Sequence, residues 1–383
     1  MLIQTTEELE AFCARLSGYD FVTVDTEFIR EKTYFPRLCL IQIACVDEAA
    51  CVDPLAKDID LSPLTELMLN EKVVKVFHAA RQDVEIFYNM TKKIPIPLFD
   101  TQIAAMVCGF RDSVSYQELV SKLLKVTLDK SMRFTDWARR PLSKEQVAYA
   151  LNDVTYLRDV YVKLKETLDK SGRGTWLAEE TGVLTNPATY AVRPDDMWKR
   201  FKPTSKKPLY LAMLKALAAW REEEAIRADR PRKHILRDEM LLDLAVAMPD
   251  SEEEMGKLRS LSAGFARGRL GKALLDVIRK VKKADPATYP AFEEKPELPA
   301  YVCPLQKMLR LLLSVQAAKN GVAEKMIASQ DELDALAAFE NADVPCVKGW
   351  RYDVFGKDAL ALKEGRLAVK YDPEKHRVTF FPA

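Results

Sequence analysis

The sequence predicts an α/β domain followed by one or two all-α domains. Strand-like and helix-like hydrophobic patterns alternate over residues 1–170, whereas residues 209–283 and 305–383 show almost only helical periodicity. Two stretches punctuated by glycine and proline, 171–208 and 284–304, separate these parts. The length of 383 residues also exceeds what one typical core organises. We therefore expect a mixed sheet covered by helices, then helical domains joined by linkers.

The first domain should begin with a short strand and a helix capped by Thr5, with Glu8 three residues later. Apolar and β-branched runs predict strands at 21–28, 37–46, 50–53 and 72–77. The first three of these runs are so close together that hairpins can join them, so this part of the sheet should be antiparallel. Amphipathic periodicity predicts helices at 61–70, 81–90, 100–109, 115–125 and 143–168.

The remaining chain is expected to be helical apart from its two breaks. Residues 171–208 lack sustained periodicity and predict a linker or wrap-around arm, and residues 284–304 contain five prolines and predict a second linker. Helices are clearest at 209–228, 235–247 and 270–281, and a small hairpin is expected from 366 to 381. The run from Asp331 to Ala337 resembles that from Glu239 to Ala245, which indicates either a diverged repeat or chance similarity between amphipathic helices.

The composition, with 48% hydrophobic and 30% charged residues, is typical of a globular protein. No apolar run reaches the roughly eighteen residues of a membrane helix, and the acidic N-terminus does not have the pattern of a signal peptide. The seven cysteines include no Cys-x-x-Cys pair, and Cys39, Cys45 and Cys51 lie in apolar runs that predict buried free thiols. These features predict a cytoplasmic protein without membrane contact, which we expect to be a monomer. The net charge of +1 neither demands nor excludes a nucleic-acid partner.

Asp25 and Glu27 stand two residues apart in the apolar run that begins at Phe21. On a strand, residues two apart point to the same face, so both carboxylates should enter one space. Two carboxylates in one space raise each other's pKa unless a cation lies between them, and hard oxygen ligands suit Mg²⁺ or Mn²⁺. The alternative is an ordinary exposed strand end.

Two further stretches place acidic residues in the same domain. Asp83 follows the strand that ends at Phe77, where a helix should begin, and it is explained equally by stabilisation of that helix start. Tyr149 and Asp153 are four residues apart on one helix face. A phenol beside a carboxylate suits the positioning of a water next to a metal, although a simple surface pair is the alternative.

Together these stretches resemble the three motifs of the DEDD superfamily of 3′–5′ exonucleases. They are Val24-Asp-Thr-Glu-Phe28, His78-Ala-Ala-Arg-Gln-Asp83 and Tyr149-Ala-Leu-Asn-Asp153. The last is similar to the tyrosine subgroup, and within it the chain resembles the bacterial ribonuclease D family, also through Tyr34–Ile43 and Asp136–Leu142. Residues 209–283 resemble an HRDC domain, a helical nucleic-acid-binding module, and residues 305–383 resemble a degenerate second copy. The resemblance implies a ribonuclease H-like mixed sheet in the first domain.

The resemblance also implies roles for the matched residues in two-metal hydrolysis of the terminal phosphodiester. Asp25 would bridge two Mg²⁺ or Mn²⁺ ions, and Glu27 and Asp153 would complete the site of the ion that binds the attacking water. Asp83 would support the second ion through water, and Tyr149 would orient the attacking water. Orientation is the safer role because a free tyrosine, with a pKa near 10, is a poor base at neutral pH. The product would be a nucleoside 5′-monophosphate, released from an RNA 3′ end, with tRNA precursors as the implied substrate.

Five residues are predicted to contact RNA. Phe28 and His78 belong to the exonuclease motifs, and His78 is expected to have a structural or phosphate-contacting role rather than to act as a base. Arg230, Arg232 and Lys233 belong to residues 202–283, which carry 19 Lys and Arg against 12 Asp and Glu. This excess of positive charge predicts a surface that follows phosphates. A solvated helix face is the alternative.

Two other functions compete with that of a 3′–5′ exoribonuclease. A DNA 3′–5′ exonuclease would use the same metal site, because discrimination depends on contacts to the 2′-hydroxyl that the sequence does not show. A catalytically inactive RNA-binding scaffold is the other alternative, but a scaffold needs none of the chemically necessary residues that are present here.

Overall fold

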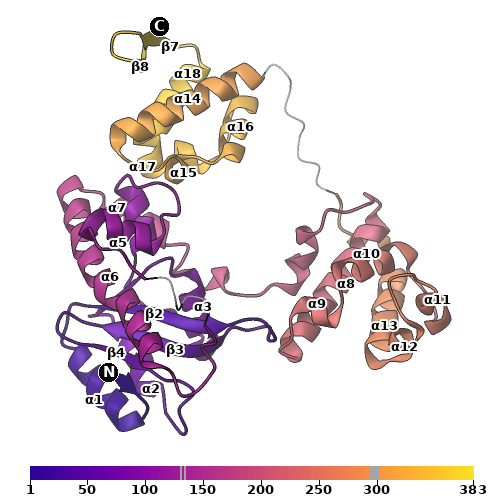
Figure 1. Ribbon diagram of the computed structural model, residues 1–383. Coiled ribbons are helices and arrows are strands. Elements are labelled where there is room, and N and C mark those ends of the chain that lie inside the picture. The colour runs from indigo at the N-terminus through magenta and orange to yellow at the C-terminus, as the bar shows by residue number, and fades with distance from the viewer. Residues whose placement is uncertain (130–131, 133–134, 293–301) are drawn as a thin grey trace. The chain divides into compact units, whose positions relative to one another are not determined.

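The computed structural model describes residues 1–129, 132, 135–292 and 302–383. A six-stranded sheet occupies the N-terminal part (Figure 1). Its strand order is β1-β4-β3-β2-β5-β6. Its strands are β1 (Leu2–Ile3), β2 (Phe21–Ile29), β3 (Arg37–Ala44), β4 (Ala49–Val52), β5 (Val74–Phe77) and β6 (Leu98–Asp100). Strands β3 and β4 are antiparallel, as their close spacing predicts, whereas β1–β4, β2–β5 and β5–β6 are parallel. The sheet is therefore mixed, as expected.

The parallel pairing of β2 with β5 positions the predicted site. Phe21 pairs with Val74 and Thr23 with Val76, so both strands reach their carboxyl ends at the same edge of the sheet. Asp25 and Glu27 follow on β2, and the chain leaving β5 leads to Asp83. Ligand sites of α/β folds form at such strand ends.

Helices surround this sheet close to the predicted positions. They are α1 (Thr6–Leu16), α2 (Ser62–Leu69), α3 (Arg81–Thr91), α4 (Thr101–Val107), α5 (Tyr116–Leu124) and α6 (Lys144–Ser171). Thr5 caps α1, since its side chain accepts a hydrogen bond from the Glu8 backbone. The long helix α6 begins with a complete capping box between Ser143 and Gln146 and ends at Gly172, whose φ of 66° closes the last turn.

Residues 171–208 contain more regular structure than the expected linker. They include helix α7 (Gly174–Thr181) and the 3₁₀ turns η1 (Pro187–Thr189) and η2 (Pro194–Arg200). Leu177 of α7 is buried in the core, and Trp176 stacks on Trp350 with ring centroids 4.4 Å apart. The weak periodicity of this stretch is explained by the shortness of α7 and by the Gly and Pro residues around it.

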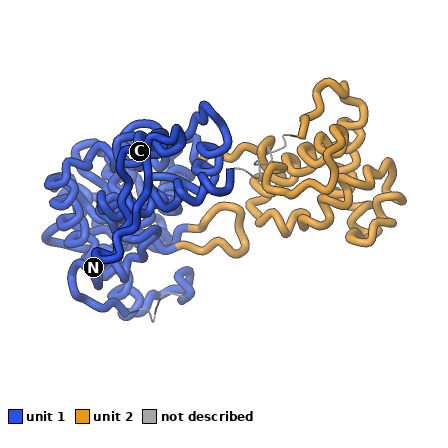
Figure 2. Tube along the Cα trace, turned by 90° about the horizontal axis from the view of Figure 1, so that it is seen from above, with its two compact units in different colours: residues 1–27, 38–189, 296–383 blue, residues 28–37, 190–295 orange. Residues whose placement is uncertain are grey.

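The C-terminal elements form one compact unit with the sheet domain. They are α14 (Cys303–Asn320), α15 (Glu324–Ile327), α16 (Gln330–Ala338), η5 (Pro345–Val347), α17 (Gly349–Arg351), the π turn η6 (Tyr352–Gly356) and α18 (Lys357–Lys363). The predicted hairpin follows as β7 (Leu367–Asp372) and β8 (Arg377–Pro382), paired antiparallel. Leu309 and Leu312 of α14 belong to the same buried core as Leu157 and Leu164 of α6. Residues 1–27, 38–189 and 296–383 accordingly make up the first unit (Figure 2).

The second unit comprises residues 28–37 and 190–295. Its helices are α8 (Pro208–Arg227), α9 (Arg232–Ile235), α10 (Asp238–Ala247), α11 (Glu252–Gly256), α12 (Ala263–Arg267) and α13 (Arg269–Lys283), followed by the 3₁₀ turn η3 (Pro286–Thr288). Leu217, Leu241 and Leu274 lie in its core, fully buried. The predicted linker 284–304 lies partly outside the described residues.

Residues 28–37, which connect β2 with β3, were not expected in the helical unit. The side chain of Tyr34 packs with Ala225 and Ile235, and its hydroxyl contacts the buried carboxylate of Glu222. The backbone N–H groups of Tyr34 and Phe35 donate to Asp229 at 3.0 and 3.1 Å. The compact units are therefore discontinuous, whereas the sequence suggests five consecutive segments. The division into those segments stays a proposal.

The order α8–α9–α10 is repeated by α14–α15–α16. Each set consists of a long helix, a four-residue helix and then a helix of nine or ten residues. Leu241 and Leu244 of α10 are buried, and so are Leu333 and Leu336 at the corresponding positions of α16. This agreement favours the diverged repeat over chance similarity.

Two chain-wide expectations can be compared with the described residues. None of their helices combines the length and the hydropathy that a membrane span requires. Cys39, Cys45 and Cys51 are buried, as predicted, and form no disulfide within the described part of the chain. The cytoplasmic location and the monomeric state stay predictions.

Candidate active site

Three of the four predicted carboxylates meet above the end of β2. Asp25 and Glu27 extend from β2 and Asp153 from α6, and one oxygen of each lies within 4.8 Å of the others. They line a cavity of about 350 Å³ together with Tyr149, His78 and Tyr116. This convergence of hard oxygen donors suits a divalent cation.

The crossing of α6 over β2 is held by a buried threonine. The hydroxyl of Thr23, two residues before Asp25, donates to the carbonyl of Val154 at 2.8 Å, and Val154 follows Asp153 directly. Thr23 is fully buried, so this bond forms away from water. The Tyr116 hydroxyl donates to the carbonyl of Asn152 at 2.9 Å. These two hydrogen bonds fix the position of the backbone on both sides of Asp153.

Asp83 lies beside this group rather than within it. It is 6% exposed in the first turn of α3, and its Oδ1 accepts a hydrogen bond from the Thr26 hydroxyl at 2.5 Å. The turn that leads into α3 is held by Asp100, whose carboxylate accepts from the backbone N–H groups of Ala79 and Ala80. Ala79 has a φ of 57°, a conformation that L-residues rarely adopt without such support.

The four carboxyl groups have raised pKa values. Burial, followed by the charges of Asp83, Asp153 and Glu27, raises the pKa of Asp25 well above its usual range. Burial, with Asp153 and Asp83, raises the pKa of Glu27 to about 8. Burial raises the pKa values of Asp83 and Asp153 to about 7 each. The described residues therefore do not provide enough positive charge at the site to stabilise all four carboxylates in their ionised form, and a bound cation would supply that charge.

Tyr149 lines the cavity one helical turn before Asp153 and contacts a buried tryptophan. The ring of Trp137 is 3% exposed and its centroid lies 6.2 Å from that of Tyr149. Arg140 holds this segment by donating to the Trp137 carbonyl at 2.7 Å and to both carboxylate oxygens of Asp53 at 2.7 and 2.9 Å. Asp53 is only 1% exposed, so the ion pair is largely shielded from water.

His78 also lines the cavity, but both of its ring nitrogens have partners. Nε2 lies 3.2 Å from the carbonyl of Val114 and Nδ1 lies 2.9 Å from the hydroxyl of Thr101. Nε2 can donate to the Val114 carbonyl, whereas the single proton of the Thr101 hydroxyl can go either to Nδ1 or to the Phe77 carbonyl 3.0 Å away. Burial lowers the pKa of His78. These contacts favour the structural role. An RNA contact by His78, or by the half-buried Phe28, stays a prediction.

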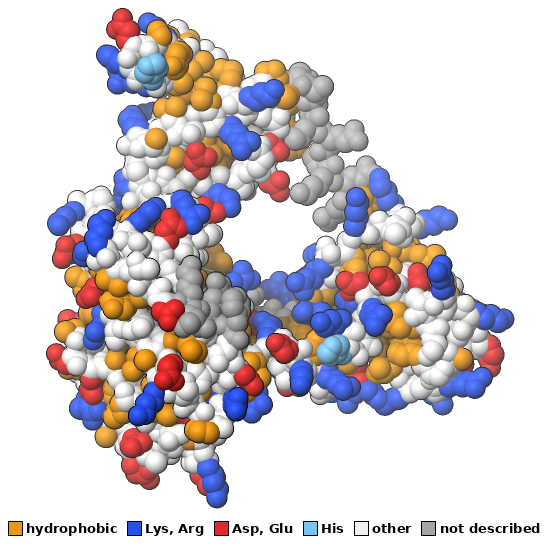
Figure 3. Space-filling view, in the orientation of Figure 1, with side chains coloured by type: hydrophobic (Ala, Val, Ile, Leu, Met, Phe, Trp, Pro, Cys, Tyr) orange, Lys and Arg blue, Asp and Glu red, His pale blue; other side chains and the backbone are white. Residues whose placement is uncertain are grey.

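The predicted basic residues lie in the second unit and differ in their surroundings. Arg232 donates to both carboxylate oxygens of Glu222 and, at 3.1 Å, to the hydroxyl of Tyr34. Arg230 and Lys233 are exposed. Arg232 is therefore part of the unit's internal packing, whereas the other two can reach a ligand. Lys and Arg side chains are spread over the visible face of this unit (Figure 3).

Several residues at the site were not expected from the sequence. Thr23, Thr26, Tyr116 and Asp100 position the carboxylates or their backbone. A polar residue within an apolar strand run is the only local signal for Thr23 and Thr26. Arg140 lies in the stretch Asp136–Leu142, which resembles the family but for which the sequence predicts no function.

Comparison with known proteins agrees with this geometry. The family model for 3′–5′ exonuclease domains matches residues 1–169, and that for HRDC domains matches residues 211–278. Ribonuclease D of Acidiphilium cryptum is 48% identical over 96% of this chain and 94% of its own. Ribonuclease D of Nitrobacter hamburgensis is 47% identical over 98% of both chains. The crystal structure of Escherichia coli RNase D superposes with a TM-score of 0.81 at 28% identity, covering 95% of this chain and 98% of that one.

The fold and the site define a 3′–5′ exonuclease domain of the divalent-metal-dependent DEDD type, joined to a helical HRDC region. The chain belongs to the ribonuclease D family. It is a 3′–5′ exoribonuclease that acts on RNA. The two alternatives, a DNA exonuclease and an inactive scaffold, are accordingly disfavoured.

Proposed function

We propose that Asp25, Glu27, Asp83 and Asp153 would hold two divalent ions, Mg²⁺ or Mn²⁺, with Asp25 as a shared ligand. The single observation that carries this proposal is the meeting of Asp25, Glu27 and Asp153 within 4.8 Å in the cavity. The raised pKa values of these acids fit a cation site, because a cation favours the ionised form. Asp83, hydrogen-bonded to Thr26 and outside the group of three, would act through water.

When bound, such ions activate a water and stabilise the charge that develops on the leaving oxygen. The protein's own contribution is to hold the reacting groups in place. Tyr149 would orient the attacking water, with its ring supported by Trp137. Tyr116 would maintain the backbone on which Asp153 is carried. The product would be a nucleoside 5′-monophosphate cleaved from the 3′ end.

We propose 3′-extended tRNA precursors as the substrate. The E. coli relative is described as an exoribonuclease involved in structured RNA processing. The net positive charge of residues 202–283 suits a large phosphate-rich substrate.

Incubation with 3′-extended tRNA and Mg²⁺, followed by sizing of the products, tests this function. We expect stepwise shortening with release of nucleoside 5′-monophosphates, loss of cleavage in EDTA and recovery with Mg²⁺ or Mn²⁺. When matched RNA and DNA oligonucleotides are incubated in parallel, the protein should cleave the RNA faster than the DNA. Cleavage that resists the chelator would contradict the metal assignment, and failure to shorten the tRNA while other RNA is degraded would contradict the substrate.

A further inference from the structure

The second unit contains a cavity that the exonuclease chemistry does not use. It has a volume of about 640 Å³, within the range of small-ligand sites, and lies among η2, α8, α9 and α10. Five cationic side chains line it, namely Arg200, Arg221, Arg232, Lys233 and Arg237. Asp238 and Glu239 are the acidic lining residues, so positive charge predominates.

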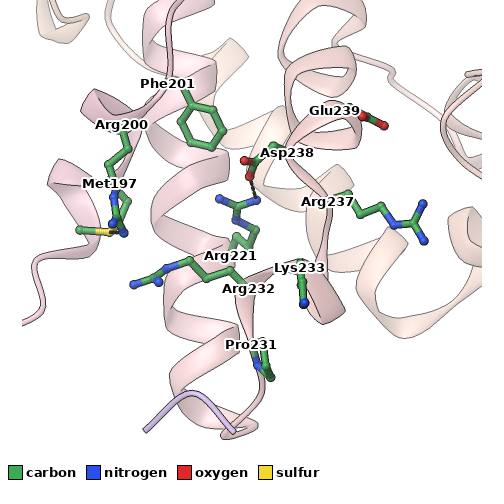
Figure 4. Close-up of a pocket in the computed structure, with 10 residues that line it drawn as sticks. All are labelled: Met197, Arg200, Phe201, Arg221, Pro231, Arg232, Lys233, Arg237, Asp238 and Glu239. Atoms are coloured by element: carbon green, nitrogen blue, oxygen red, sulfur yellow. Dashed lines mark hydrogen bonds and ion pairs between the residues drawn. The ribbon is translucent and has the colours of Figure 1, made fainter. Parts of the chain in front are cut away.

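Arg221 is the buried group of this cavity. Its side chain is 7% exposed, and Nη1 donates to the Leu236 carbonyl at 3.0 Å and to Asp238 at 2.6 Å. Its Nε is buried and, among the described residues, has no hydrogen-bond partner. An unpaired buried donor of a charged group is costly, so the protein compensates the charge of Arg221 at the wall of the cavity only in part. Arg221 lies in the middle of the lining residues (Figure 4).

Lys233 and Arg237 provide positive charge that the protein does not neutralise. Both are exposed, and neither forms an ion pair with any residue in the described part of the chain. Arg232, by contrast, is paired with Glu222. Lys233 and Arg237 are therefore available to a phosphate group, as is the exposed Arg200.

Three apolar residues, Met197, Phe201 and Pro231, complete the lining of the cavity. Phe201 is half-buried and has the guanidinium of Arg221 5.3 Å from its ring centroid. Met197 lies one turn earlier in η2 and adds a flexible, polarisable surface. An aromatic ring beside cationic groups is the combination that single-stranded nucleic-acid sites use, with the base on the ring and the backbone on the cations.

We propose that this cavity binds one nucleotide of the substrate RNA, with its phosphate at Lys233 and Arg237 and its base against Phe201 and Met197. The inference rests on the proposed function, since the ligand is the RNA whose 3′ end is trimmed. A bound nucleotide would give the enzyme a second point of attachment to long RNA, which a dinucleotide does not have.

Equilibrium binding of a 3′-extended tRNA to the full-length protein in EDTA tests the inference without cleavage. The double variant Lys233→Ala, Arg237→Ala should lower affinity by at least about tenfold and, because one phosphate contact is lost, reduce the slope of log affinity against log salt by about 1. Phe201→Ala should weaken binding by at least about fivefold, whereas Phe201→Tyr should retain it. The charge-matched control, Lys257→Ala, Arg259→Ala, removes two exposed cations of the same unit outside the cavity and should change affinity less than about twofold.

Equal losses in the cavity variant and the control would overturn the inference, because general charge would then explain binding. Tight binding of free AMP that is lost in Lys233→Ala, Arg237→Ala, with unchanged RNA affinity, would assign the cavity to a free nucleotide instead. Both outcomes leave the proposed function intact, since wild-type cleavage of the tRNA in Mg²⁺ is measured separately. Circular dichroism of each variant verifies folding.

Discussion

At the scale of single residues, the active site combines groups that repel one another. Asp25, Glu27 and Asp153 have oxygens within 4.8 Å of one another in a partly buried cavity. Hydrogen bonds from Thr23 and Tyr116 to the α6 backbone hold this arrangement, so the carboxylates do not move apart to relieve the repulsion. In such a preorganised site, the free-energy cost of bringing the carboxylates together is met when the protein folds and not during the reaction.

We predict that Asp25→Asn or Asp153→Asn lowers hydrolysis by more than about 100-fold, because each change removes an anionic ligand from the centre of the cluster. Binding of 3′-extended tRNA should change little. Cleavage assays in Mg²⁺ and binding assays in EDTA measure the two effects. Asp159→Asn, an exposed acid on the same helix, is the control and should cleave like wild type. Wild-type turnover of Asp25→Asn would contradict the assignment.

We also predict that the metal-free protein becomes less stable as the pH rises from about 6 to 8. The pKa values of Glu27, Asp83 and Asp153 are about 8, 7 and 7, above their ordinary values, so the folded state binds more protons than the unfolded chain. The stability that these protons provide is fully present below about pH 4 and is lost as the pH passes through 7 to 8.

Bound Mn²⁺ would replace those protons, so its effect on the melting temperature should increase with pH. Scanning fluorimetry in EDTA and in Mn²⁺ across this pH range measures both trends. In the Asp25→Asn variant, Mn²⁺ should raise the melting temperature less than in the wild-type protein. A melting temperature in EDTA that rises over the same interval would contradict the prediction.

At the scale of elements, helix α6 was predictable and the β2–β3 connection was not. The sequence of α6 carries its own information, namely a Ser143–Gln146 capping box and sustained periodicity. The docking of residues 28–37 depends instead on pairs such as Tyr34 and Glu222, which are 188 positions apart. A single sequence contains no local signal for such a contact. The five motif residues can be recognised because each lies in a local motif, and the motifs follow in a fixed order. These residues are Asp25, Glu27, Asp83, Tyr149 and Asp153. Arg140 and Tyr116 act through contacts that are distant in the sequence, so the sequence does not predict their roles.

We predict that Tyr34→Phe lowers the free energy of unfolding by about 1–3 kcal/mol, because the buried Glu222 and the half-buried Arg232 each lose a hydrogen-bond partner. Chemical denaturation followed by fluorescence measures the change. Tyr352→Phe is the control, since the described residues give the exposed hydroxyl of Tyr352 no hydrogen-bond partner. Equal effects of the two substitutions would show that the Tyr34 hydroxyl does not stabilise the unit.

At the scale of the whole molecule, the C-terminal helices are part of the catalytic unit's core. Leu309 and Leu312 share a buried cluster with residues of α4, α6 and α7. Arg173 donates to the carbonyls of Asn320 and Gly321, and Arg351 pairs with Glu179 and Glu180. The sequence predicts these helices but not their attachment, since amphipathic faces do not identify their partners.

Ending the chain at residue 292 should therefore destabilise the exonuclease domain itself. The truncation removes α14 to β8, which belong to the shared core, and uncovers apolar side chains such as Trp176, which stacks on Trp350. We expect a lower melting temperature and aggregation, measured by scanning calorimetry and light scattering. Ending the chain at residue 365 removes only β7 and β8 and should have a smaller effect. A monodisperse, fully active 1–292 protein would contradict the shared core.

The passage of residues 28–37 into the helical unit has a consequence for how such enzymes diversify. The chain changes unit four times, at 27–28, 37–38, 189–190 and 295–296. If recombination transferred only a contiguous HRDC segment, Glu222 and Ile235 would lose the contacts that they make with Tyr34. A functional chimaera must therefore inherit two separated stretches from the same parent. In this architecture, inheritance of the helical unit is linked to that of a ten-residue stretch between two strands of the catalytic sheet.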